Sequence, residues 1–180
     1  MQDKYVIKYQ YRSFAVYKLI CSIAFIFATT LLGHWFSEKL TNRRKTLQAI
    51  SEAISKTETL ISFGLGEITG VVIESFCKIN GFENVQLFCD EGNSFCESFH
   101  RCIDAIPSEC SLTEEDKDLL KRFSEGLGSS DLAGQTSNCE YYKKLFDERI
   151  SEAKEKEKSL KKLYKVLGFS LGCIIILMIV

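Results

Sequence analysis

The chain has 180 residues, enough for one domain of ordinary size, and carries 23 basic and 24 acidic side chains. The formal net charge of −1 gives no global reason to expect a nucleic acid as a partner. Pro107 is the single proline, and so low a proline content favours long, uninterrupted helices.

Two apolar stretches lie near the ends of the chain. Leu19–Phe36 would measure about 27 Å as a helix, close to the thickness of a bilayer core. Leu163–Val180 is the second stretch, and its Tyr164 suits a membrane interface. A secretory signal is the alternative for the first stretch, but no small-x-small cleavage site follows it. The sequence therefore predicts an extension over 1–18, transmembrane helices over 19–36 and 163–180, and a central domain over 37–162.

Basic residues around the two stretches predict the orientation. Four precede the first stretch, whereas ten lie where the central domain meets the two stretches. Because cytoplasmic flanks carry the excess of Lys and Arg, we expect the central domain on the cytoplasmic side. The membrane-proximal basic residues either contact anionic lipid or form a solvated face. They are Arg43, Arg44, Lys45, Lys161, Lys162 and Lys165.

The first part of the central domain predicts a long helix followed by a short one. Apolar residues spaced as in a heptad indicate a helix over 37–62 with one narrow seam. The seam consists of Leu40, Leu47, Ile50, Ile54, Thr57 and Ile61. Gly64 and Gly66 should end this helix, since glycine readily adopts the left-handed conformation. A short helix over about 67–78 should stop at Asn80-Gly81.

The remaining segments also carry helical patterns. Residues 82–106 show helical spacing with a break at 90–93. Thr113, followed by three acidic residues, predicts the N-cap of the next helix. A last helix should run from Asp131 to the chain end with a solvated stalk over 151–162. Its expected buried stripe is Tyr141, Leu145, Ile150 and Ala153. We therefore expect an all-α antiparallel bundle of about six helices, anchored by amino- and carboxyl-terminal transmembrane helices.

Residues 123–131, FSEGLGSSD, admit two interpretations. A phosphate-binding loop of the Walker type would need a lysine and a different glycine spacing. As a corner between helices, Gly126 or Gly128 would end one helix, and Ser129, Ser130 or Asp131 would cap the next. The residue pattern favours the corner.

A cluster of cysteines, Cys89, Cys96, Cys102 and Cys110, lies around His100. Cys96 and His100 are spaced i,i+4 and could fill two positions of a zinc site, but no C-x-x-C pair accompanies them. Buried core cysteine is the favoured interpretation, and metal binding, disulfide formation or redox use remain alternatives. Neither histidine of the chain has a nucleophile and an acid around it, so we predict no catalytic residue and no cofactor.

Four groups of residues occur in a fixed order between the chain ends. They are Phe27–Thr30 with Gly33; Ile61–Gly64; Phe123 with Leu127–Asp131 and Gln135; and Tyr164 with Leu167–Phe169 and Gly172. From about residue 17 onward the chain thus resembles the stage III sporulation protein AB family of endospore-forming bacteria. The resemblance implies structural corners or interaction positions at Phe63, Gly64, Gly126, Gly128, Asp131 and Gln135. The chain departs from the family pattern in its first 15 residues, in lacking a proline after Gly64, and in its cysteine-rich segment 80–112.

The resemblance implies a non-enzymatic platform component of the secretion-like complex that joins mother cell and forespore during sporulation. The fold would be similar to the cytoplasmic domain of the type II secretion platform protein. Expected partners are other stage III sporulation proteins, including a secretion-type ATPase, and the lipid bilayer, with a homo-oligomer left open and nucleic acid not expected. The expected location is the mother-cell membrane around the forespore. The competing hypothesis, based on Cys96 and His100, is a membrane-anchored metal- or redox-sensing module.

Overall fold

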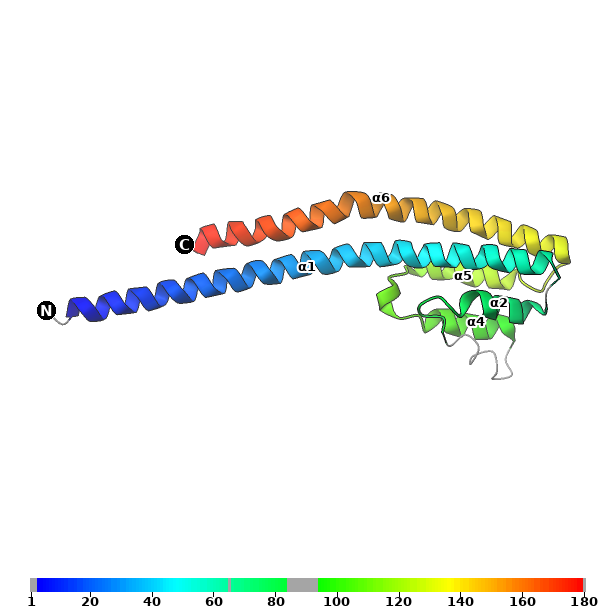
Figure 1. Cartoon of the computed structure of the whole chain (residues 1–180), viewed down its shortest axis with the longest axis horizontal. Coiled ribbons are helices and arrows are strands. Elements are labelled where there is room, and N and C mark those ends of the chain that lie inside the picture. The colour runs from blue at the N-terminus through cyan, green and yellow to red at the C-terminus, as the bar shows by residue number, and fades with distance from the viewer. Residues whose placement is uncertain (1–2, 65, 84–93, 180) are drawn as a thin grey trace. The chain divides into compact units, whose positions relative to one another are not determined.

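The computed structural model describes the backbone of residues 3–64, 66–83 and 94–179. Side chains within these ranges are described except at 3–22, 26, 165, 168–169, 171–173 and 175–179. The helices are α1 (Asp3–Ser62), α2 (Ile68–Phe76), α4 (Phe95–Asp104), the 3-10 turn η1 (Ser108–Cys110), α5 (Glu114–Glu125) and α6 (Leu132–Ile179) (Figure 1). These described ranges contain no strand, so the all-α prediction is confirmed for them.

The chain divides into two units. Met1–Glu38 and Lys158–Val180 form the terminal unit, and Lys39–Glu157 form the central unit. Both predicted transmembrane helices fall mainly in the terminal unit, and many of their side chains lie outside the described residues. Among the described residues, no helix contains a segment that is both long and apolar enough to cross a membrane. Transmembrane anchoring therefore stays a prediction.

In the central unit, α6 runs antiparallel beside α1, as expected for the bundle (Figure 1). Partner numbers on α6 fall as those on α1 rise, which fixes the direction. Side-chain hydrogen bonds between the two helices include Thr41 to Glu157 at 2.9 Å, Ser51 to Asp147 at 2.9 Å, and Lys143 to Ser55 at 3.0 Å. The predicted stalk over 151–162 is therefore not wholly solvated, because Glu157 contacts α1 and Ala153 is buried.

The seam predicted for α1 is buried as expected. Leu47, Ile50, Ile54 and Thr57 are fully buried and Ile61 almost so, while Leu40 is half-buried. The helix ends at Ser62, and Gly64 then adopts a left-handed φ of 66° with its N–H donated to the carbonyl oxygen of Ile61 at 2.9 Å. The glycine at this position thus ends α1 in the way that the sequence predicts.

Phenylalanine rings from separate segments form the centre of the core. Phe76 of α2 lies 5.6 Å from Phe82, 5.3 Å from Phe99 of α4 and 6.3 Å from Phe123 of α5, measured between ring centroids. All four side chains are fully buried. Because each aromatic side chain buries a large apolar area, this cluster is a main source of the unit's stability.

Two shorter predictions have different outcomes. The helix expected around 82–89 falls almost entirely in 84–93, outside the described residues. α4 begins after Ser94, whose hydroxyl accepts the N–H of Glu97 at 3.3 Å. Thr113 caps α5 as predicted, and a reciprocal bond from the Thr113 N–H to the Asp116 carboxylate completes a capping box.

The buried stripe predicted for α6 is wrong in its aromatic member. Tyr141 is 58% exposed, whereas its neighbour Tyr142 packs against Phe123 with ring centroids 5.7 Å apart. One residue along a helix turns a side chain by about 100°, so of the two adjacent tyrosines only the half-buried Tyr142 packs against the core. Buried positions of α6 are Gln135, Cys139, Phe146 and Ala153, while Leu145 and Ile150 are half-buried.

Candidate functional site

The segment 123–131 is a corner between α5 and α6. Gly126 is the C-cap of α5, and a side chain there would collide with Asn138, whose amide nitrogen donates to the Phe123 carbonyl at 3.3 Å. Gly128 adopts a φ of 79°, in the left-handed region that glycine occupies without strain. Asp131 accepts the N–H of Gly134 at 2.9 Å and so caps the first turn of α6.

Gln135 holds this corner from inside. Its side chain is almost fully buried, and its Oε1 accepts the Gly128 N–H at 3.1 Å. Its Nε2 donates to the Ser130 carbonyl at 3.2 Å. The N–H groups of Gly126, Leu127 and Gly128 are thus bonded within the protein itself, which supports a structural role for the corner. Phe63, at the end of α1, is 74% exposed and takes no part in this network.

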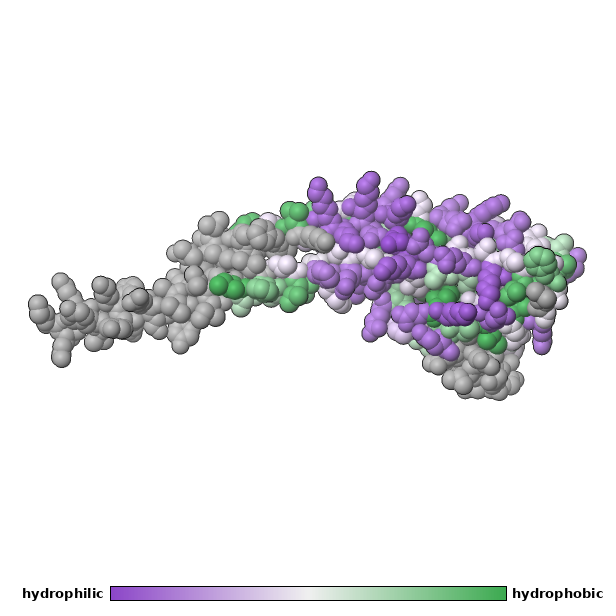
Figure 2. All heavy atoms as spheres, viewed as in Figure 1, coloured by the Kyte–Doolittle hydropathy of each residue, from purple (hydrophilic) through white to green (hydrophobic). Residues whose placement is uncertain are grey.

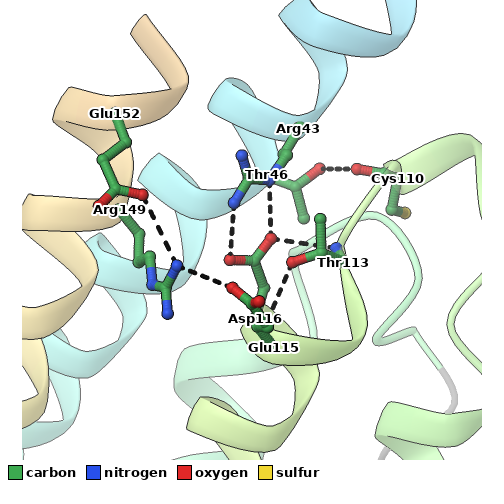
Figure 3. A network of polar contacts seen from close by, with 8 residues as sticks. All are labelled: Arg43, Thr46, Cys110, Thr113, Glu115, Asp116, Arg149 and Glu152. Carbon is green, nitrogen blue, oxygen red and sulfur yellow. Dashed lines mark hydrogen bonds and ion pairs between the residues drawn. The ribbon is translucent and has the colours of Figure 1, made fainter. Parts of the chain in front are cut away.

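The most buried charged contact joins α1 to α5. Arg43 donates Nε–H and Nη2–H to the two carboxylate oxygens of Asp116, at 2.8 and 2.9 Å (Figure 3). The Asp116 side chain is fully buried, and that of Arg43 is 13% exposed. Next to this pair, the Thr46 hydroxyl donates to the Cys110 carbonyl at 3.2 Å. Asp116 therefore both completes the capping box of α5 and docks α5 on α1.

The environment of Asp116 favours its charged form. Burial by itself would raise the pKa of the carboxyl, but hydrogen bonds from Arg43 and Thr113 outweigh the burial and hold the pKa below its ordinary value. The hydrogen bond to Asp116 correspondingly raises the pKa of the Arg43 guanidinium. The pair is thus an ionised, bidentate contact.

The other predicted membrane-proximal basic residues are placed differently. Arg44 forms an ion pair with Glu157 of α6. Lys45 is exposed, Lys161 is half-buried, Lys162 is exposed, and the side chain of Lys165 lies outside the described residues. Arg43 and Arg44 therefore link helices of the central unit, and lipid contact through the remaining lysines stays a prediction.

The cysteine cluster does not converge. Cys96 Sγ lies 3.6 Å from His100 Nε2, and the same nitrogen lies 3.3 Å from the carbonyl oxygen of Lys121. Cys102 and Cys110 are buried in the core, and Cys89 lies outside the described residues. Among the described side chains, no three Cys, His, Asp or Glu residues are arranged to hold a metal ion.

The cysteines that the structure describes behave as core or surface thiols. Those free of disulfides are Cys77, Cys96, Cys102, Cys110 and Cys139. Burial raises the pKa of Cys139 to about 12 and also raises the pKa of Cys110. A thiol with a raised pKa is a poor nucleophile near neutral pH, so neither of these two residues suits a redox role.

A cavity of about 430 Å³ opens between α1, η1 and α5 in the central unit. Its lining comprises Lys39, Leu40, Arg43, Ile106, Pro107, Ser108, Ser111, Leu112, Glu114 and Lys117. A second hollow of about 370 Å³ lies on the other flank of η1 and includes Lys45, Thr46 and Asn80. Neither contains a histidine or an evident nucleophile–base pair.

A family model described as stage III sporulation protein AB matches residues 18–180 of the chain. The chain belongs to the stage III sporulation protein AB family. The resemblance inferred from the sequence motifs is thereby confirmed, and membership implies a role in stage III of sporulation. Comparison with the curated proteins and with the solved structures gave no match.

Two features of this stage III sporulation protein AB family member were missed at the level of sequence. The dipole of α5 by itself accounts for an acidic residue at position 116. No local pattern indicates that Asp116 also binds Arg43, which is 73 residues away in the sequence. The residues that line the cavity between α1 and α5 come from three separate segments, so the pattern within any one segment does not predict the cavity.

Proposed function

We propose that this chain is a non-enzymatic platform component of the complex that joins mother cell and forespore. In this proposal two helices anchor it in the mother-cell membrane around the forespore, and the central unit lies in the mother-cell cytoplasm. There it would contact other stage III sporulation proteins, including a secretion-type ATPase. The proposal extends the family's sporulation role to a specific position and task.

The main support for anchoring is the distribution of exposed apolar side chains. Most large apolar side chains that are exposed belong to the terminal unit: Ile23, Phe25, Phe27, Leu31, Leu32, Trp35, Phe36, Leu163, Val166, Leu167 and Ile174. Figure 2 shows purple, hydrophilic residues along the visible face of α6 in the central unit, while green residues mark the described part of the terminal unit. So much exposed apolar surface is typical of contact with lipid or another protein.

The support for a platform role comes from the central unit. Its most buried charges, Arg43 and Asp116, pair with each other, and Gly126 packs against Asn138 at the corner between α5 and α6. Such an arrangement links the helices of the unit, and the described lining of its two cavities contains no evident nucleophile–base pair. We therefore assign the central unit to protein contacts.

The anchoring proposal is tested by charge substitution and membrane fractionation in sporulating cells. Phe25→Lys/Phe27→Lys should release the chain from a carbonate-resistant membrane fraction, because both residues lie near the centre of the predicted span, where each charge costs about 3 kcal/mol. Leu132→Lys/Tyr141→Lys changes two similarly exposed residues of the central unit and should leave fractionation unchanged. Equal behaviour of the two variants would contradict the proposal.

The platform task has its own test. The purified full chain should hydrolyse no ATP, and cross-linking in sporulating cells should recover a secretion-type ATPase with it. ATP hydrolysis by the chain itself would refute the non-enzymatic role. Failure to recover any sporulation protein would refute the platform role.

The metal-sensing alternative is less well supported. A structural zinc site uses four ligands, whereas the described residues bring together only Cys96 and His100. Elemental analysis of the purified chain should find no stoichiometric zinc. Zinc that is present and is lost in both Cys96→Ser and His100→Ala would restore this alternative.

A further inference from the structure

Exposed apolar side chains lie at the end of the central unit where α1 ends and α6 begins (Figure 1). Phe63, directly after α1, is 74% exposed, and Leu132, the first residue of α6, is 55% exposed. Among the described residues of the central unit, Tyr141 is the only other large apolar side chain that is exposed. Two of these three side chains therefore belong to the segments that meet at one end of the unit.

The pairing of α1 with α6 places Phe63 and Leu132 at nearly the same level. The two helices are antiparallel, and the Lys143 ammonium donates to the Ser55 hydroxyl at 3.0 Å. Phe63 lies eight residues after Ser55 and is therefore level with Gln135, only three residues or about 4.5 Å along the axis from Leu132. Leu132 also precedes Lys143 by eleven residues, about three turns, so it leaves α6 on the side that faces α1.

The same two segments carry acidic side chains and no basic ones. Residues 57–70 and 126–139 contain no lysine, arginine or histidine, although the whole chain is almost balanced, with 23 basic and 24 acidic residues. Their acids, each exposed or half-buried, are Glu58, Glu67 and Asp131. Burial raises the pKa of Cys139 and the charge of Glu58 raises it further, so Glu58 lies near the first turns of α6.

Acidic side chains elsewhere in the central unit pair with basic ones. Glu74 binds Lys56 at 2.8 Å, and Asp104 binds Lys121 at 2.6 Å. We call the surface where α1 ends and α6 begins the corner end, and it consists of Phe63, Leu132, Glu58, Glu67 and Asp131. Because its own segments supply no cation, the corner end attracts positive charge from another molecule.

The apolar and acidic groups together narrow the class of partner. Anionic lipid and nucleic acid would be repelled by the acids. A second copy of the chain that docked through the same surface would bring like charges together, which disfavours the pairing. A purely basic segment would leave Phe63 and Leu132 uncovered. A protein segment that combines Lys or Arg side chains with a large apolar side chain would use both parts of the surface.

We propose that the corner end binds a basic segment of another protein, and that an apolar side chain of that segment covers Phe63 and Leu132. The Lys and Arg side chains of the segment lie beside Glu58, Glu67 and Asp131. Protein interfaces typically have an apolar centre and a polar rim, and this arrangement follows the same plan. The inference rests on the proposed platform role, in which the central unit serves protein contacts.

The test places a photoreactive benzoylphenylalanine at position 63 of the full chain in sporulating cells. We expect one main adduct with another protein, and mass spectrometry should locate the cross-link in a peptide of net positive charge. The same photoreactive residue at position 141 is the placement control, because Tyr141 is 58% exposed but lies outside the corner end. It should give little of that adduct.

Charge substitution tests the acids. Glu67→Lys/Asp131→Asn should reduce the adduct about tenfold, because it removes two acids and adds a cation. The new asparagine keeps an acceptor for the bond that caps α6. Asp118→Asn/Glu148→Lys makes the same change of charge at two exposed residues elsewhere in the unit and should leave the adduct within about twofold. Thermal unfolding establishes that each variant is folded, and if the double variant unfolds, Glu67→Lys alone decides, since Glu67 makes no side-chain cap bond.

Four results would overturn the inference. They are an acidic or neutral cross-linked peptide, an adduct only with a second copy of this chain, equal losses in the two charge variants, and no adduct from position 63. Cross-linking also separates this inference from the platform role. Sporulation proteins recovered from position 141 but not from position 63 refute the corner end only, whereas recovery from neither position contradicts the platform role as well.

Discussion

Residues 41–46 of α1 are linked to η1, α5 and α6 by charged and hydrogen-bonding side chains. From Leu47 to Ile61 the buried face of the same helix is mainly apolar, with Ser51 and Thr57 as its polar members. We call these parts the polar end and the aromatic end of the central unit. The polar end contains Arg43–Asp116, Arg44–Glu157 and Thr46–Cys110. The aromatic end contains the rings of Phe76, Phe82, Phe99 and Phe123. One helix is thus held by two kinds of interaction that respond differently to substitution and pH.

The difference indicates that one end of the unit contributes mainly to stability and the other mainly to the choice of a single helix arrangement. Apolar burial is large but non-directional, so it stabilises the aromatic end without fixing every register. A buried bidentate ion pair adds little net stability but becomes costly when one partner is missing. The Arg43–Asp116 pair therefore selects one arrangement of α5 on α1 among those that the apolar core would permit.

The largest expected effect is at the aromatic end. Phe76→Ala should lower the free energy of unfolding by about 3–5 kcal/mol, because it removes a fully buried ring and leaves a cavity. Urea unfolding of the full chain in mild detergent, followed by circular dichroism, measures it. Phe63→Ala is the matched control and should change stability by less than about 0.5 kcal/mol, since Phe63 is largely exposed. Similar costs in the two variants would show that the ring cluster does not hold this end.

The polar end should respond almost as strongly to removal of one partner. Asp116→Asn should cost about 3 kcal/mol, because the Arg43 charge then stays buried without its counter-ion. The double variant Arg43→Met/Asp116→Asn, which keeps an acceptor for the Thr113 N–H, should recover most of that loss in the same unfolding assay. A double variant as unstable as the single one would show that the ion pair itself stabilises the fold. The proposed difference between the polar end and the aromatic end would then be wrong.

The corner next to the aromatic end offers a test of backbone strain alone. Gly128→Val should cost about 1–2 kcal/mol, because a residue other than glycine is strained at a φ of 79° and no atom lies within 4 Å of the added Cβ. Gly70→Ala is the matched control, since Gly70 is helical and equally uncrowded, and it should raise stability by about 0.5–1 kcal/mol. A neutral Gly128→Val would show that the corner tolerates another conformation.

A buried hydroxyl in the apolar seam of α1 predicts that one substitution should increase stability. Thr57 is fully buried, and its hydroxyl has no hydrogen-bond partner among the residues that the structure describes. Thr57→Val keeps the shape and removes the unsatisfied hydroxyl, so it should raise the free energy of unfolding by about 1 kcal/mol. Ser51→Ala, which breaks a bond to Asp147, should lower it and serves as the opposite control. A loss of stability in Thr57→Val would mean that the hydroxyl is bonded in solution.

The smallest expected effect is a pH dependence confined to the polar end. The pKa of Asp116 is lower in the folded chain than in the unfolded one, so its contribution is present above about pH 4 and is lost as pH falls through the folded value. The stability difference between the wild-type chain and Asp116→Asn should therefore shrink below about pH 4. Unfolding curves between pH 7 and pH 2 measure it, and a difference that stayed constant would contradict the ionised pair.

Local signals in the sequence predicted the element boundaries well. Thr113 and Asp116 form a capping box within four residues, and Gly64 ends α1 through its own backbone conformation. Both depend on atoms of neighbouring residues, which the sequence specifies directly. The same holds for the seam of α1, because a helical repeat fixes which residues share a face.

Contacts between distant segments could not be predicted in this way. Tyr141 and Tyr142 are adjacent on α6, and the position of Phe123 decides that Tyr142 is the one that packs against the core. In the sequence Arg43 is one of several basic residues near a predicted span, for which lipid contact and a solvated face are the two alternatives. The carboxylate that matches it comes from a helix whose orientation on α1 no local pattern determines.

The double role of Asp116 has a consequence for local opening. The first turn of α5 cannot fray without losing the hydrogen bond from the Thr113 N–H to the Asp116 carboxylate. The same carboxylate also accepts the hydrogen bonds of Arg43 of α1. Fraying of α5 and undocking of α5 from α1 should then be one event. Amide hydrogens at the start of α5 would exchange with solvent at the slow rate of a shared cooperative unit, although a helix end usually exchanges fast.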